Sequence, residues 1–143
     1  MKKIAIFFFI VVAIVCTVAY VYLNYTYNYR NAQRENSEFN ISKDEEIEGS
    51  ELTTIINKAI DTNTKNEIQK DNKGKYIDNR NNSINIDIKF IDNDVTYNME
   101  MLYNSGMQNF LYYYGNIKFK CSDVQYHKET GKIKYIEFEQ TTT

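Results

Sequence analysis

An unbroken apolar segment near the N-terminus constrains this chain more than any other feature. From Ile4 to Leu23 no residue is charged. This length of about 20 residues is what an α-helix needs to cross the hydrocarbon core of a bilayer, which is ~30 Å thick. The segment therefore predicts a single membrane-spanning helix over residues 4–23, with the rest of the chain outside the bilayer core.

The residues that flank the apolar segment predict its orientation. Lys2 and Lys3 precede it, and positive flanks are retained in the cytoplasm. Residues 1–3 are then a cytoplasmic tail, although Arg30 and Arg34 near the other end weaken this bias. Tyrosines favour the headgroup level of a membrane, and several gather at the outer end of the segment: Tyr20, Tyr22, Tyr25, Tyr27 and Tyr29.

Two other fates fit the same segment. A cleaved signal peptide ends at a small-x-small site, and Thr17-Val18-Ala19 matches loosely, but the apolar run continues past it to Leu23. A lipoprotein would be modified at Cys16, yet a small residue should precede the cysteine and Val15 stands there. Both observations favour an uncleaved anchor, in which Cys16 is an ordinary membrane-helix residue.

Composition limits the fold and the partners of the chain beyond the anchor. After a stalk or linker over residues 24–49, residues 50–143 are enough for one small core and not two. The pI near 5.5 argues against nucleic acid as a partner, because phosphate binding needs a basic surface. The abundance of Asn, Lys, Ile and Tyr, whose codons are AT-rich, indicates an AT-rich bacterial genome.

Helical periodicity predicts two helices before the first strand. Tyr25, Tyr29 and Ala32 have helical spacing, which predicts that the membrane helix continues as a stalk toward Phe39, before an acidic linker. Ser50 is the expected N-cap of the next helix, which fades at residues 61–64 before a polar loop over 65–82. Its apolar stripe is Leu52, Ile55, Ile56, Ala59 and Ile60.

Alternating apolar residues then predict a hairpin. Residues 84–90 and 95–101 alternate between apolar and polar side chains, and Asp92-Asn93-Asp94 is typical of a turn. A second helix of the domain is expected over residues 107–114, with Gly115 as its C-cap.

The C-terminal part predicts a second hairpin. A strand begins at Ile117 and changes parity near Ser122-Asp123, which indicates a bulge. Residues 127–132 form the turn, with Gly131 in a left-handed conformation, and the last strand covers residues 133–139.

The predicted fold class is therefore α+β. An antiparallel sheet of about four strands packs with two short helices, and one face of the sheet stays wet. The expected contact between the first domain helix and the sheet is made by Leu52, Ile55, Ile56, Ile60, Ile84, Ile86, Ile88, Phe119 and Phe138.

The sequence contains no convincing catalytic, cofactor-binding or metal-binding motif. His127 is the single histidine and is expected as an exposed turn residue, whereas Cys121 is expected as a buried, unpaired thiol. The segment Asp71–Gly74 fails the EF-hand pattern, and the acidic residues at 92–94 are better explained by a turn.

One helix offers a weak partner-binding signal. Tyr112 and Tyr113 should point outward from the helix over 107–114, and exposed tyrosines are good interface anchors. Tyr114 shares the face of Met107 and Leu111 and is expected in the core. Tyr112 and Tyr113 are therefore the candidate partner-contact residues.

Four stretches carry a resemblance to other proteins. Gly49–Asp61, Phe119–Cys121, Tyr126–Lys132 and Phe138–Gln140 resemble small single-pass, membrane-anchored proteins of AT-rich Firmicutes, chiefly clostridial. This resemblance implies a bacterial envelope protein and implies no activity and no site residues. The layout is also similar to that of type IV pilins and pseudopilins, without the prepilin cleavage motif.

These observations predict a membrane-anchored extracytoplasmic domain without enzymatic activity. Its expected role is structural or protein-interacting in the bacterial envelope, within a pilus-like or secretion assembly, with another envelope protein as partner. The alternative is a small enzyme or ligand carrier with a pocket between helix and sheet, which Tyr97, Met99 and Phe110 would line.

Overall fold

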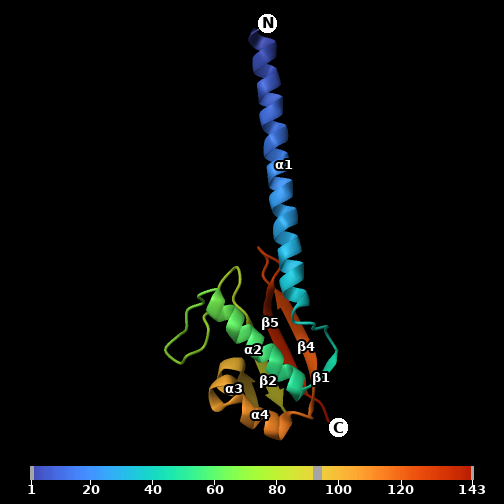
Figure 1. Ribbon diagram of the computed structural model, residues 1–143, viewed down its shortest axis with the longest axis vertical. Helices are drawn as coiled ribbons and strands as arrows, with labels where there is room; N and C mark the ends of the chain where they lie inside the picture. The colour runs from blue at the N-terminus through green and yellow to red at the C-terminus, as the bar shows by residue number, and fades with distance from the viewer. Residues whose placement is uncertain (1, 92–94, 143) are drawn as a thin grey trace.

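The computed structural model describes residues 2–91 and 95–142 and shows a long helix projecting from a small α+β domain (Figure 1). The predicted turn at residues 92–94 lies outside the described residues. The elements are α1 (Lys2–Ser37), β1 (Glu46–Glu48), α2 (Gly49–Lys65), β2 (Asn85–Phe90), β3 (Val95–Asn98), α3 (Met99–Ser105), α4 (Met107–Tyr114), β4 (Lys118–Tyr126) and β5 (Ile133–Gln140).

Helix α1 is continuous from the apolar segment into the stalk. It contains 36 residues and is therefore about 54 Å long at 1.5 Å per residue. Every side chain from Ile4 to Leu23 is exposed, and Ala32 is the one buried residue among those described in α1. The apolar segment thus has no partner within the described chain and is long enough to span a membrane.

The sheet is mixed, and the prediction of a purely antiparallel sheet was wrong. Its five strands have the order β1-β4-β5-β2-β3, and β2 runs parallel to β5, whereas the other neighbours are antiparallel. The cause is the α3–α4 pair, which returns the chain from β3 to the far end of the sheet before β4 begins (Figure 1). Strand β5 then runs in the same direction as β2.

Two short segments differ from the sequence-based expectation. The second strand ends at Asn98 and not at residue 101, because the Asn98 Oδ1 atom accepts the N–H of Met101 at 2.9 Å and so caps α3. In the expected acidic linker, Glu46–Glu48 forms β1, where Ile47 is buried and pairs with Phe119 of β4.

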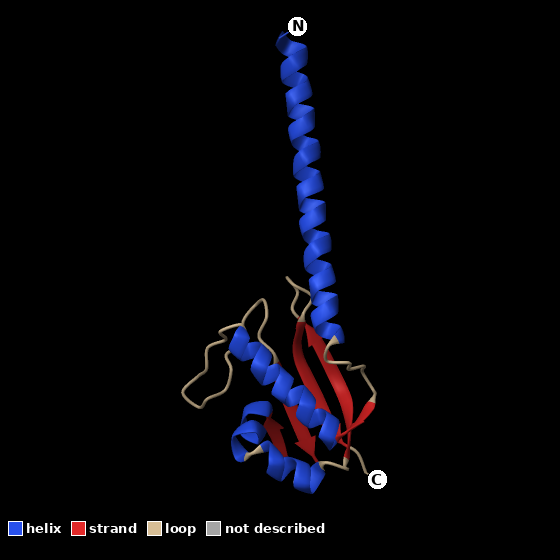
Figure 2. Ribbon diagram, in the orientation of Figure 1, coloured by secondary structure: helices blue, strands red, loops and turns tan. Residues whose placement is uncertain are grey.

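Helices α2, α3 and α4 lie on one face of the sheet (Figure 2). The apolar stripe of α2 packs there because neither it nor the apolar face of the sheet is stable in water. The expected helix–sheet contact is confirmed, since the core cluster contains all nine predicted residues: Leu52, Ile55, Ile56, Ile60, Ile84, Ile86, Ile88, Phe119 and Phe138.

The ends of α2 also differ from expectation. The helix begins at Gly49, and its N-cap residue Glu48 makes no side-chain capping bond, so the predicted Ser50 cap was wrong. Gly49 lies against α4, where a Cβ atom would overlap the carbonyl oxygen of Tyr114. The helix continues to Lys65 instead of fading at residue 61, because Asn63 is fully buried and bonds to the chain before β2.

The second hairpin was correctly predicted. Strands β4 and β5 pair antiparallel with a register shift between Cys121 and Asp123, which is the expected bulge. Gly131 in the turn has φ = 70°, a conformation in which a glycine avoids the steric cost of a Cβ atom.

Candidate functional site

The stalk is joined to the domain at the β4–β5 turn. The Asn36 side chain donates to the carbonyl oxygen of Gly131 and accepts the N–H of Ile133, both at 2.8 Å. Beside it, the Lys132 Nζ and Glu35 Oε2 atoms form an ion pair at 2.8 Å. These three side-chain contacts, made by the neighbouring residues Glu35 and Asn36, therefore join the end of α1 to the β4–β5 turn.

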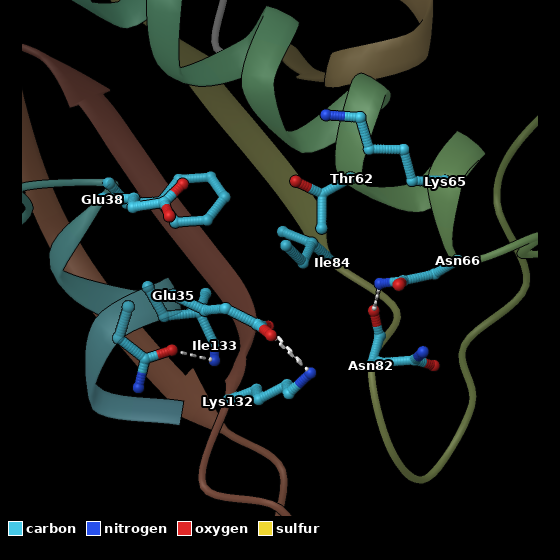
Figure 3. A pocket seen from close by; sticks show the side chains of 11 residues that line it. Glu35, Glu38, Thr62, Lys65, Asn66, Asn82, Ile84, Lys132 and Ile133 are labelled. Atoms are coloured by element: carbon cyan, nitrogen blue, oxygen red, sulfur yellow. Dashed lines mark hydrogen bonds and ion pairs between the residues drawn. The ribbon is translucent and has the colours of Figure 1, made fainter. Parts of the chain in front are cut away.

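A cavity of about 210 Å³ lies beside this joint, between the end of α1 and the end of α2 (Figure 3). Several of the polar groups around it are paired: Glu35 pairs with Lys132, and the Asn66 side chain donates to the carbonyl oxygen of Asn82 at 3.2 Å. Glu38 pairs with Lys58 at 3.4 Å. This arrangement stabilises the joint and brings together no nucleophile and base among the described residues.

The candidate partner-contact residues lie at the other end of the domain. Figure 1 shows α3 and α4 at the end of the domain opposite the N-terminus of α1. Tyr112 is 83% exposed and Tyr113 is 71% exposed, and their rings meet edge to face with centroids 5.0 Å apart. Their predicted exposure is confirmed, while their contact with a partner stays a prediction.

The stretch of chain that carries these tyrosines has no charged side chain of its own, although Asp71, Lys73 and Lys75 lie beside its Met101 and Asn104. Between Met101 and Ile117 the sequence contains no Asp, Glu, Lys or Arg, although charged residues make up 25% of the chain. We call the exposed side chains of this stretch the α3–α4 tip: Met101, Tyr103, Asn104, Ser105, Gln108, Asn109, Leu111, Tyr112, Tyr113 and Asn116. Sequence reasoning found the two tyrosines and missed the uncharged run, which was visible as a gap in the charge pattern.

The tip is backed by a packed aromatic cluster. Tyr114 is half-buried against the core and stacks on Phe110 with ring centroids 5.4 Å apart, whereas Leu111, which was expected on the same face, is exposed. Phe90 of β2 contacts both rings, at 4.9 Å from Tyr114 and 6.4 Å from Phe110. Helix α4 therefore presents Tyr112 and Tyr113 from a rigid base.

The alternative pocket between helix and sheet gains no support from this geometry. Met99 and Phe110 are buried in the core, and Tyr97 packs its ring against Phe90 at a centroid distance of 5.4 Å. These side chains fill the space that the pocket would need.

His127 is buried, so the prediction of an exposed turn residue was wrong. Only 3% of it is exposed, and its Nε2 atom lies 2.8 Å from the carbonyl oxygen of Ser83. Since a carbonyl only accepts, Nε2 carries the proton. The β4–β5 turn folds onto the loop before β2, where Thr130 also donates to the carbonyl oxygen of Asn81 at 2.6 Å, and this long-range contact has no local sequence signal.

Two acidic residues, one of them in the segment that fails the EF-hand pattern, accept hydrogen bonds from backbone N–H groups. The Asp71 Oδ1 atom accepts the N–H groups of Lys75 and Lys73, and these bonds lower the pKa of its carboxyl group. Glu100, which sequence reasoning missed, is buried and accepts the N–H of Tyr76 at 2.8 Å. Within residues 2–91 and 95–142, no group of three or more His, Cys, Asp or Glu side chains is placed to hold a metal ion.

Cys121 is buried and unpaired, as predicted. Its side chain is 1% exposed, and burial, with a smaller effect from Asp123, raises the pKa of the thiol to about 11. Because the thiolate is the reactive form, the native thiol is both inaccessible and protonated at neutral pH.

We expect slow labelling of Cys121 by a maleimide in the folded protein at pH 7.5, and fast labelling in denaturant. A Cys16→Ser variant isolates the signal, since Cys16 lies on exposed α1. Mass spectrometry of the labelled chain over time gives both rates. Equal rates in native and denaturing buffer, or a disulfide-linked dimer on a non-reducing gel, would contradict a buried thiol.

Comparison with protein-family models, with curated proteins and with solved structures found no match to this chain.

Proposed function

We propose that this chain is a single-pass membrane protein whose α+β domain lies outside the cytoplasm and has a structural or protein-interaction role in the bacterial envelope. The observation that carries the proposal is α1, in which every side chain from Ile4 to Leu23 is exposed and apolar or weakly polar. Exposing such a segment to water is unfavourable, and a bilayer removes that cost.

The joint between α1 and the domain supports a presenting role. Residues 24–37 of α1 continue roughly 20 Å beyond the apolar segment, and Asn36 fixes the β4–β5 turn to the end of the helix. The domain is therefore held off the membrane, with the α3–α4 tip facing away from it. The finer proposal is a pilus-like or secretion assembly, for which the support is the layout of an apolar helix continuous with an α+β domain.

Topology can be tested with two variants that each add one cysteine to a Cys16→Ser background, in which the remaining Cys121 is buried. Lys128→Cys places a thiol on the exposed β4–β5 turn, and a cysteine inserted after Met1 places one before the membrane segment while keeping Lys2 and Lys3. With a membrane-impermeant maleimide on intact cells, we expect Lys128→Cys to be labelled before lysis and the inserted N-terminal cysteine only after it. Lys2 and Lys3 are the physical reason, because positive flanks stay inside.

Each part of the proposal has its own contradicting result. Labelling of the inserted N-terminal cysteine and protection of Lys128→Cys in intact cells would reverse the orientation. A mature chain that starts near Tyr20 and leaves the membrane fraction would show a cleaved signal peptide and remove the anchor.

A further inference from the structure

We propose that a small cavity between α3 and the loop before β2 binds an α-amino acid or a similar small zwitterion, whose ammonium group is received by Glu100. The cavity measures about 110 Å³, and its lining includes Asp71, Lys73 and Lys75 of the loop and Asn98 and Glu100 at the start of α3. It shares no lining residue with the cavity at the joint. It has room for about four water molecules at ~30 Å³ each, or for one small solute.

The observation that points to a ligand is an oxygen atom of Glu100 without a partner. The residue is 5% exposed, and its Oε1 atom accepts the N–H of Tyr76 at 2.8 Å. Its Oε2 atom is also buried and has no hydrogen-bond partner among the described residues. A buried carboxylate oxygen without a donor has lost its hydration and gained nothing in return, and such atoms are rare in folded proteins. A hydrogen-bond donor in the adjoining cavity would supply what the chain does not.

The other charged residues of the lining argue against a metal ion as that ligand. Ca²⁺ takes roughly six to eight oxygen ligands, whereas the lining contains two carboxyl groups. One of them is already engaged, because the Asp71 Oδ1 atom accepts the N–H groups of Lys73 and Lys75 at 2.8 and 2.9 Å. The two lysines also place positive charge beside the cavity, and neither forms an ion pair within the described residues. A bare cation would meet like charges there.

A zwitterion matches both kinds of charge in the lining. Its ammonium group would donate to the Glu100 Oε2 atom in a charge-assisted hydrogen bond, and its carboxylate would pair with Lys73 and Lys75. A simple amine would lack the second contact and would be repelled by the lysines. A simple carboxylate would leave the Oε2 atom without a donor. The chemistry of the lining therefore favours a compound that carries both groups close together.

Titration of the isotope-labelled full-length protein with glycine, in detergent micelles and followed by backbone amide chemical shifts, tests the inference. We expect saturable shifts at Tyr76 and Glu100. Glu100→Gln keeps an acceptor for the Tyr76 N–H and removes the negative charge, so glycine should bind at least about tenfold more weakly. Glu51→Gln is the matched control, because Glu51 is an exposed carboxylate on α2 that does not line the cavity. Acetate and methylamine, which each carry one of the two charges, should bind more weakly than glycine.

A second variant tests the same site without changing a buried residue. Lys73 is exposed and Lys75 is half-buried, so their joint replacement by alanine should leave the domain folded, as unchanged thermal unfolding would show. Glycine should then bind more weakly, because its carboxylate loses its partners. Methylamine should bind more tightly, because the repulsion by the lysines is removed.

Four results would overturn the inference. An absence of saturable shifts with glycine would mean that the cavity holds water only, and saturable shifts with Ca²⁺ alone would make it a metal site. Methylamine that binds as tightly as glycine would remove the role of the lysines, and glycine binding that Glu100→Gln leaves unchanged would remove the role of Glu100. The inference goes beyond the proposed function. Because the measurement in micelles does not depend on membrane orientation, its failure is distinguishable from a failed topology experiment.

Discussion

Truncation of Ile86 to alanine is expected to lower the free energy of unfolding by about 2–5 kcal/mol. Ile86 is 1% exposed on β2, and Ile56 of α2, which is fully buried, belongs to the same core cluster. Removing the side chain leaves a cavity at the helix–sheet contact as well as losing the transfer free energy of the buried atoms. This is a large share of the roughly 5–15 kcal/mol that stabilises a typical domain.

Urea unfolding of the full-length protein in detergent, followed by circular dichroism, measures this loss. The matched control is Lys89→Ala on the same strand, because Lys89 lies on the polar face and its side chain is 45% exposed. Its ion pairs are solvent-exposed, so the change should have little effect. Equal losses for Ile86→Ala and Lys89→Ala would mean that both faces of the sheet are covered, and would direct attention to a partner on the polar face.

Local periodicity explains why so much of this core could be predicted. The stripe on α2 and the alternation in β2 each show one apolar face within a single element, so Ile56 and Ile86 were identifiable without knowing how the elements meet. The exposure of Tyr112 and Tyr113 followed from helical spacing in the same way.

Except for the local cap that Asn98 provides to α3, the main unpredicted features depend on contacts between distant segments. The parallel pairing of β2 with β5 requires α3 and α4 to return the chain across the domain, and no pattern within β2 or β5 specifies that direction. In the sequence Ile47 is an isolated apolar residue in an acidic linker. Only the pairing of β1 with β4 shows that it belongs to the sheet. His127 is buried by a contact with Ser83, from which it is separated by 44 residues.

Asn63 is another residue whose role depends on a distant segment, and its substitution is the second prediction with a large expected effect. Near the end of α2 a polar Asp-Thr-Asn-Thr sequence predicts a fading helix, yet Asn63 is fully buried. Its Nδ2 donates to the carbonyl oxygen of Ile84 at 2.7 Å, and its Oδ1 accepts the N–H of Ile84 at 2.8 Å. The side chain thus satisfies both backbone groups of a buried residue just before β2.

Asn63→Ala is expected to destabilise the domain by about 2–6 kcal/mol, because each of the two buried backbone groups would lose its partner at about 1–3 kcal/mol. The control is Asn66→Ala at the same helix end, where a single, longer bond to Asn82 is part-buried and the loss should stay below about 1 kcal/mol. Urea unfolding gives both values, and amide exchange at Ile84 should accelerate in Asn63→Ala alone. If Asn63→Ala proved as mild as Asn66→Ala, water would be reaching the Ile84 backbone, and the amide of Asn63 would not be what joins the end of α2 to the sheet.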